Sequence, residues 1–272
     1  MKFLFSSMIV FGLLSSQYAM AEELKARLQT QDKKVQNGVL VSRQAGSIDF
    51  RADGGQTVRV PIAQVAYLQF PINEEDDQQL TRLFNDGDYQ KLAPWLDELL
   101  TQKMPYIDIP SNLTPNFMRW MIASYWSGGY DKTIEISKAL ERFGDVDNYK
   151  NKALFYRGLA QLEKGDYAAM EAFLASPAGS VIYPVDSVSR LYIDARIAQK
   201  NKQYTSAIRI ASRIMALHSR DADWMPQAEL LCAELYFQMK MPESAKSVLA
   251  DITEFYSDPQ IQKKAAAIAA IK

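Results

Sequence analysis

Residues 148–176 read NYKNKALFYRGLAQLEKGDYAAMEAFLAS. Apolar residues recur at helical spacing on both sides of a short break at Lys164, Gly165 and Asp166, and this pattern predicts two short amphipathic helices joined by a tight turn. Gly158 is expected where the two helices approach each other most closely. A single hairpin of this size buries little apolar surface, so we expect similar hairpins on either side of it.

Tyrosines follow the predicted turns at a nearly constant interval. They stand at 89, 130, 167 and 204, which are 41, 37 and 37 residues apart, and each comes directly after a turn containing glycine or asparagine. A fifth break, at residues 240–242, follows at a similar distance. Self-similarity at a fixed interval of this length indicates an array of helical repeats.

The residues around these turns resemble the tetratricopeptide repeat (TPR) family, whose motif places small residues at helix contacts and large residues in gaps. The positions that match are Leu154, Gly158, Tyr167 and Leu174 in the central unit, Leu191, Ala195, Tyr204, Ala207 and Ala211 in the next, and Ala233, Tyr236, Ala245 and Leu249 in the last. Departures from the motif are Arg157, Gln161 and Met170 in the central unit and Met121 and Thr133 in the unit before it. The resemblance implies a mainly α fold over residues 73–272, a right-handed α–α solenoid of about five TPR-like helix pairs with a C-terminal capping helix at 259–271. Another solenoid of paired helices is the alternative.

Several polar residues stand where they could cap these helices. Thr114, Asp166, Asp186 and Asp258 each precede a predicted helix, and prolines follow Thr114 and Asp258. We expect residues 176–184, which contain two prolines and a glycine, to form a loop between the third and fourth helix pairs.

A small β-rich domain is expected at residues 22–72. Residues 39–41, 48–50, 57–60 and 65–70 are short β-prone runs separated largely by glycine-containing turns, which favours four antiparallel strands. Residues 22–34 are charged, with two leucines four apart, and suggest a short helix. Residues 35–70 weakly resemble a small SH3-like or Sm-like barrel, and a β-meander that caps the first helices is an equal alternative.

The N-terminus has the pattern of a secretory signal peptide. Lys2 precedes an apolar run at 3–14, and Ala19-Met20-Ala21 provides a processing site, so residues 1–21 are expected to be removed. The mature chain should then be a soluble periplasmic protein without a transmembrane segment, although an uncleaved N-terminal anchor is the alternative. The only cysteine, Cys232, lies far from the junction, which argues against a lipoprotein.

Charge and residue content argue against several functions. With 31 basic and 32 acidic residues, the chain lacks the positive field of a nucleic-acid-binding protein. His218 is the only histidine and is expected at a helix end, and Cys232 lies on an apolar helical face. The acidic run at 74–77 is interpreted as the first turn of a helix, where the helix dipole favours carboxylates, and not as a metal site. We therefore expect no enzyme activity, no cofactor and no metal.

The remaining prediction is a binding function. In TPR arrays the first helix of each pair lines the concave face, where protein or peptide partners bind. The residues expected to contact a partner there are Met118, Ile122, Tyr125, Phe155, Leu159, Tyr192, Arg196 and Glu234. The sequence thus predicts a non-catalytic periplasmic adaptor or scaffold, for example in an envelope, secretion or appendage assembly. The alternative is a module that associates with peptidoglycan or glycan, with weak enzymatic activity, and self-association into a homo-oligomer is a further expectation.

Overall fold

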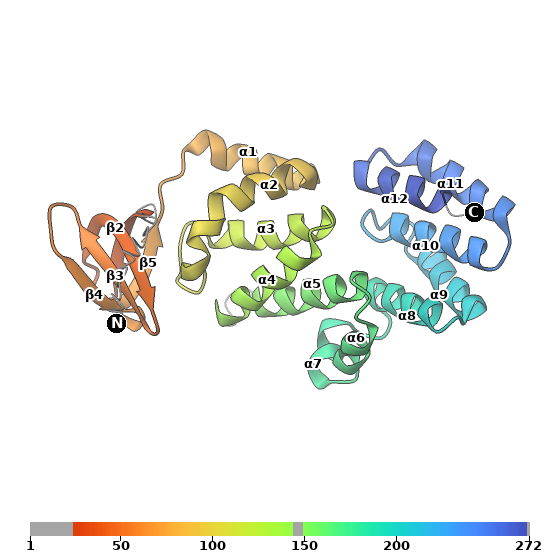
Figure 1. The fold of residues 1–272 in the computed structure, drawn as a ribbon, viewed down its shortest axis with the longest axis horizontal. Coiled ribbons are helices and arrows are strands. Elements are labelled where there is room, and N and C mark those ends of the chain that lie inside the picture. The colour runs from red at the N-terminus through yellow and green to blue at the C-terminus, as the bar shows by residue number, and fades with distance from the viewer. Residues whose placement is uncertain (1–23, 144–148, 271–272) are drawn as a thin grey trace, which may run out of the picture.

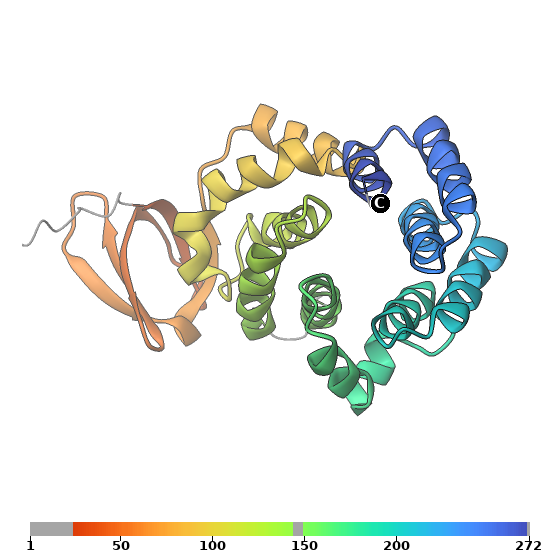
Figure 2. The ribbon, with the colours of Figure 1, turned by 45° about the vertical axis from the view of Figure 1, so that its right-hand side comes forward.

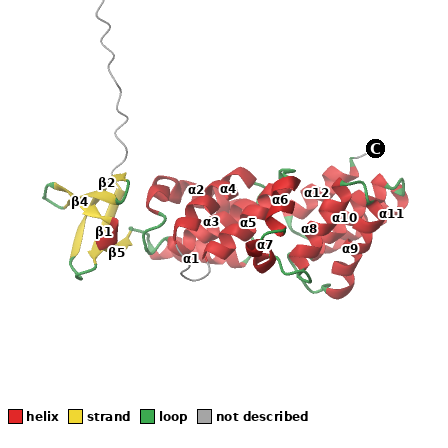
Figure 3. Cartoon of the chain, turned by 90° about the horizontal axis from the view of Figure 1, so that it is seen from below, coloured by secondary structure: helices red, strands yellow, loops and turns green. Residues whose placement is uncertain are grey.

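The computed structural model describes residues 24–143 and 149–270, so the predicted signal peptide lies outside the described residues. The described residues begin with a five-stranded antiparallel sheet, seen at one end of the molecule in Figures 1 and 3. Its strands are β1 (Leu24–Thr30), β2 (Val35–Gln44), β3 (Ser47–Ala52), β4 (Thr57–Pro61) and β5 (Val65–Gln69). Their order across the sheet is β4-β3-β2-β1-β5.

The prediction of a helix within residues 22–34 was wrong, because β1 fills most of that segment. Strand β1 pairs antiparallel with both β2 and β5. Leu24, Ala26 and Leu28 alternate along it, and Ala26 and Leu28 are buried. The two leucines are also four residues apart, which imitates helical spacing. Pairing on both sides satisfies the backbone of this segment, and a lone amphipathic turn could not do so.

Twelve α-helices follow in the described residues, so the prediction of a mainly helical chain behind a small antiparallel sheet is confirmed. They are α1 (Glu74–Asn85), α2 (Tyr89–Leu100), α3 (Thr114–Trp126), α4 (Tyr130–Leu140), α5 (Tyr149–Glu163), α6 (Tyr167–Leu174), α7 (Pro177–Ile182), α8 (Val188–Lys200), α9 (Tyr204–Leu217), α10 (Met225–Gln238), α11 (Pro242–Phe255) and α12 (Pro259–Ala269). The expected loop at 176–184 therefore contains a short helix, α7, which Ser176 caps by accepting a hydrogen bond from the Gly179 N–H.

The predicted turns share one backbone conformation. Gly87, Gly128 and Gly165 each have a positive φ, between 70° and 85°, just before the tyrosine that starts the next helix. Lys202 and Lys240 take the same left-handed conformation in the two later turns. A left-handed residue closes the last turn of a helix, and glycine adopts it with the least strain.

Two predicted caps are confirmed and two are corrected. Asp166 and Asp258 accept hydrogen bonds from backbone N–H groups of α6 and α12. Ser187, and not Asp186, caps α8. Thr114 is itself the first residue of α3, and its hydroxyl accepts a hydrogen bond from the Ser111 N–H at 3.0 Å.

The contact at Gly158 also differs from the prediction. A Cβ placed there would meet Tyr183 Oη at 2.8 Å and Met170 Sδ, on α6, at 3.3 Å. The nearest neighbour of Gly158 is thus the tyrosine that follows α7, because α7 folds back against α5 and α6.

The helices pack pairwise along a curve that returns on itself. Each of the pairs α3–α4, α8–α9 and α10–α11 packs together, and α9 also packs on α10. Figure 2 shows this curve, with α12 beside the first helices. At that point the Gln260 side-chain amide of α12 donates to the carbonyl of Ser127, which follows α3, at 3.5 Å. Among the described residues, no helix is both long and apolar enough to cross a membrane.

A shared core joins the sheet to the first helices. Leu68 and Phe70, at the end of β5, are buried in one cluster with Ile107 and Ile109 from the connection between α2 and α3. The Leu68 N–H donates to the Pro110 carbonyl at 2.9 Å. This connection therefore covers the outer edge of β5 and leaves β4 as the other edge of the sheet.

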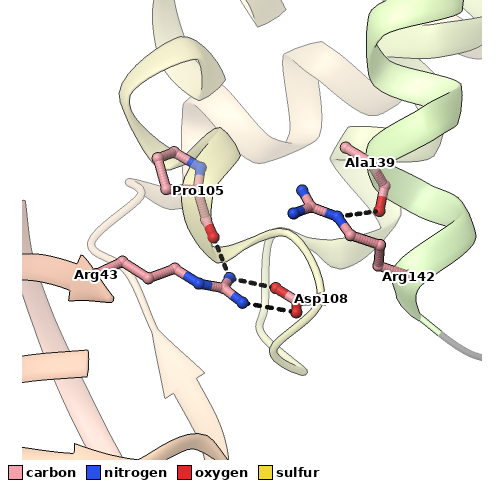
Figure 4. Close-up of polar contacts among 5 residues, drawn as sticks. All are labelled: Arg43, Pro105, Asp108, Ala139 and Arg142. Carbon is pink, nitrogen blue, oxygen red and sulfur yellow. Dashed lines mark hydrogen bonds and ion pairs between the residues drawn. The ribbon is translucent and has the colours of Figure 1, made fainter. Parts of the chain in front are cut away.

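An ion pair spans the same junction (Figure 4). Arg43 on β2 donates to both carboxylate oxygens of Asp108, with Nη2 2.8 Å from Oδ2, and it also donates to the Pro105 carbonyl. Partial burial alone would raise the pKa of Asp108, but the hydrogen bond and charge of Arg43 hold this pKa below its usual value. The pair fixes the end of β2 against the helical part of the chain.

Candidate functional site on the inner face

The eight residues predicted to contact a partner all lie on α3, α5, α8 and α10, the inner helices, which follow the inside of the curve in Figure 2. They differ in exposure. Met118, Ile122 and Tyr125 are on α3, Phe155 and Leu159 on α5, Tyr192 and Arg196 on α8, and Glu234 on α10. Four of them are buried, namely Met118, Tyr125, Leu159 and Tyr192. The other four, Ile122, Phe155, Arg196 and Glu234, are partly exposed. The buried residues pack the helices together, and the second group keeps part of its side-chain surface exposed.

An aromatic cluster centred on Trp224 connects the inner helices. Trp224 immediately precedes α10, and its ring lies 5.3 Å from Tyr192, 6.4 Å from Trp126 and 6.5 Å from Phe155, measured between centroids. These partners come from α8, α3 and α5. Two of these contacts are edge-to-face and the one with Tyr192 is tilted; aromatic contacts at such distances are favourable, so the cluster links α3, α5, α8 and the start of α10. Sequence reasoning did not identify Trp224, because it lies in a connection outside the helical period.

Beside this cluster lies a cavity of about 300 Å³. Its walls come from α5, α8, α10 and α12, and its polar lining residues are Glu163, Tyr192, Arg196, Gln227, Glu234 and Lys264. Three of these, Tyr192, Arg196 and Glu234, were predicted to contact a partner. Glu163, Gln227 and Lys264 were not. The packing of α12 on α10 brings Lys264 to Gln227, whereas Glu163 meets Tyr192 and Arg196 where α5 lies beside α8. The structure thus joins part of the predicted stripe into one polar site.

Arg196 and Glu163 meet in the cavity through Tyr192. The Tyr192 hydroxyl donates to Glu163 Oε1 at 3.2 Å and accepts from Arg196 Nη1 at 3.2 Å, whereas the two charged groups are 3.9 Å apart. Arg196 Nε is buried and has no hydrogen-bond partner among the described residues. Burial raises the pKa of Tyr192, so its hydroxyl stays protonated at neutral pH. The guanidinium therefore keeps unused donor capacity next to the cavity.

Lys264 contributes a second cation that has only a neutral acceptor. Its Nζ donates to the side-chain oxygen of Gln227 at 3.0 Å. Burial lowers the pKa of Lys264, against the opposing effect of Glu163 and Glu234. Glu234 itself accepts a hydrogen bond from the Gln199 side-chain amide at 3.0 Å. A partly buried ammonium without a carboxylate in hydrogen-bond contact is costly to the folded state.

A second cavity, of about 250 Å³, lies where the curve closes. It is lined by Tyr89, Trp126 and Asp223 together with residues of α12, and it shares Gln227 and Lys264 with the first cavity. Burial raises the pKa of Asp223, with a smaller effect from the nearby charge of Asp221. Both cavities are thus lined by Lys264 of α12, the helix whose Gln260 contacts Ser127 after α3.

The residues singled out for reactivity lie away from these cavities. Cys232 is buried with its Sγ 3.6 Å from Met215 Sδ, and burial raises the pKa of its thiol to about 12, as expected for a structural cysteine. His218 is a partly exposed residue that ends α9, as predicted. The acidic run Glu74 to Asp77 forms the first turn of α1, capped by Asn73. Within the described ranges, no cluster of His, Cys, Asp and Glu has the arrangement of a metal site.

Comparison of the sequence with protein-family models and with curated proteins gave no match.

Proposed function

We propose that this chain is an exported, non-catalytic binding protein in which a TPR-like solenoid holds a protein or peptide partner on its inner face. The observation that carries this proposal is the repetition of one helical hairpin, with the same turn conformation at Gly87, Gly128 and Gly165. Repeated hairpins of this kind curve into a surface that is made of their first helices. An adaptor or scaffold in a periplasmic assembly would use that surface.

The accessible part of the inner face has the composition of a partner-binding surface. Ile122 and Phe155 are partly exposed apolar groups, and Arg196 and Glu234 are partly exposed charges. Aromatic residues and arginine are enriched among residues that dominate binding energy at interfaces. In this proposal Tyr125, Leu159, Met118 and Tyr192 keep the inner helices in place and do not touch the partner.

Site-specific photo-crosslinking in the native cell envelope tests this proposal. A photoreactive amino acid replaces Ile122 or Glu234 on the inner helices, and the control carries it at Arg209, an exposed residue of the outer helix α9. We expect crosslinks to one defined partner from positions 122 and 234 and none to that partner from position 209. Equal crosslinking at all three positions, or none at the inner two, would refute the assignment, and crosslinks to a second copy of the chain would replace the adaptor with a homo-oligomer.

Export is tested separately. Residues 1–21 are fused to a mature β-lactamase, and the periplasmic location of the enzyme is read from ampicillin resistance. Sensitive cells that express the fusion would contradict the proposed location without affecting the binding proposal.

A further inference from the structure

The charged groups that line the cavity between α5, α8, α10 and α12 balance one another. Arg196 and Lys264 carry positive charge, and Glu163 and Glu234 carry negative charge. A simple anion in this cavity would be attracted by the two cations and repelled by the two carboxylates. A simple cation would be attracted by the carboxylates and repelled by the two cations. A ligand that carries both charges can satisfy both pairs.

The unused hydrogen-bond donors of Arg196 and Lys264 favour a carboxylate as the negative group of the ligand. Arg196 Nε is buried without a partner among the described residues, and Lys264 donates only to the neutral oxygen of Gln227. Both groups are donors only, and a carboxylate supplies two acceptor oxygens with the planar geometry that guanidinium prefers.

The carboxylates of the cavity can receive an ammonium group. Glu163 accepts from Tyr192, and Glu234 accepts from Gln199. Each carboxylate has two oxygens with about four acceptor positions in all, so these bonds leave capacity on both residues. Arg196 and Glu163 form an ion pair at 3.9 Å, which is too long for a direct hydrogen bond, so neither group uses its hydrogen-bonding capacity on the other.

The rest of the wall is apolar. Leu230 and Leu231 on α10 and Ala267 and Ile268 on α12 complete the lining. An apolar side chain placed against them would lose contact with water at a gain of about 25 cal/mol for each Å² buried. The cavity volume of about 300 Å³ is at the small end of the range for ligand pockets.

We propose that this cavity binds a small zwitterion with an apolar side chain, that is, a free α-amino acid or a dipeptide. Its carboxylate lies against Arg196 and Lys264, and its ammonium lies against Glu163 and Glu234. The zwitterion would share Arg196 and Glu234 with the proposed partner surface. The test below uses the purified chain without a partner, so its result does not depend on the proposed protein partner.

Isothermal titration calorimetry of the purified full chain tests the inference with four probes. L-leucine and L-alanyl-L-leucine carry both charges, N-acetyl-L-leucine lacks the ammonium, and L-leucinamide lacks the carboxylate. We expect L-leucine or L-alanyl-L-leucine to bind. N-acetyl-L-leucine and L-leucinamide should bind at least about tenfold more weakly than the tighter of these two zwitterions, because each lacks one charged hydrogen-bond pair. Failure of both zwitterions to bind at millimolar concentration, or equal binding of the amide, would overturn the proposal.

Variants then locate the site. Arg196→Gln and Lys264→Gln should each weaken the zwitterion about tenfold or more. Lys263→Gln, one residue away on the exposed side of α12, is the matched control and should bind like the wild type. Circular dichroism confirms that each variant is folded, and Lys264→Gln retains the test if Arg196→Gln does not fold. Zwitterion binding that survives Lys264→Gln would overturn the assignment.

Discussion

The contact between Gly158 and Tyr183 gives the sharpest test of how the central hairpin is held. Gly158 lies inside α5, where alanine would normally be favoured by about 1 kcal/mol. Here the added Cβ would lie 2.8 Å from Tyr183 Oη, and the Tyr183 ring is fully buried with its hydroxyl donating to the Phe155 carbonyl. The ring has to move, which costs about 1–3 kcal/mol for overpacking and about 1 kcal/mol for the weakened hydrogen bond. Gly158→Ala should therefore lower the free energy of unfolding by about 1–3 kcal/mol.

A double-mutant cycle with Tyr183→Phe isolates this contact. The single change Tyr183→Phe should cost about 1 kcal/mol for the lost hydrogen bond. It also removes the nearest atom, so that the closest remaining contacts of a Cβ at 158 are Met170 Sδ and the ring, both at 3.3 Å. In this background Gly158→Ala should be close to neutral, which gives a coupling energy of about 1–3 kcal/mol.

Urea unfolding followed by far-UV circular dichroism measures all four proteins. Ala178→Leu, at an exposed position of α7, is the control and should change the free energy of unfolding by less than about 0.5 kcal/mol. The reasoning is refuted if Gly158→Ala stabilises the wild-type protein, or if its effect is the same with Tyr183 and with Phe at that position.

Three further predictions follow from particular groups. Arg43→Gln should lower the free energy of unfolding by about 1–3 kcal/mol at neutral pH. Because Arg43 lowers the pKa of Asp108, the difference between the two proteins should be complete above the ordinary carboxyl pKa of about 4 and should disappear as the pH falls through the lowered pKa. Urea unfolding of both proteins across that pH range measures this difference. Lys264→Met should be as stable as the wild type or more stable at neutral pH. The stability of the wild type relative to the variant should increase as the pH rises through the lowered pKa of Lys264, because the folded state then no longer holds a partly buried cation. Thermal unfolding measured against pH tests this, and a variant that is less stable than the wild type at pH 7 would contradict it. Cys232 should not react with Ellman's reagent at pH 8 until the packing of α9 on α10 opens, so rapid labelling of the native protein would show that its thiol is not buried.

The helical part was predictable because its signals are local. Each turn needs a left-handed residue, and glycine supplied it three times, followed by the tyrosine that begins the next helix. The helices between the turns show their period in the sequence alone. Lys202 and Lys240 replace glycine in the later turns, and the interval between repeats still located them.

The errors arose where contacts that carry no periodic signal decide the structure. Strand β1 was mistaken for a helix because its pairing with β5 depends on residues near position 67, some 40 residues further along the chain. The helix α7 was missed because residues 176–184 contain turn-forming residues, although a serine cap and the packing of Gly179 against the Phe173 backbone stabilise a short helix there. Neither contact leaves a periodic trace in the local sequence.

The candidate site was only half predictable for the same reason. Counting along the first helix of each pair found Tyr192, Arg196 and Glu234, because inner-face positions repeat with the helical period. Lys264 could not be found in this way, since it reaches the cavity from a helix interpreted as a cap.

Its position nevertheless carries the strongest functional argument. As part of a capping helix, Lys264 gains only the hydrogen bond to Gln227 from an ammonium group that lines the cavity, where burial lowers its pKa. The neighbouring Lys263 is exposed to solvent. Stability alone would favour an apolar residue at 264, next to Ala265 and Ile268 in the core. Lys264 lowers stability at this point and lies beside Arg196, which has an unused donor. In our proposal the carboxylate of the zwitterion binds both groups and so offsets this loss of stability.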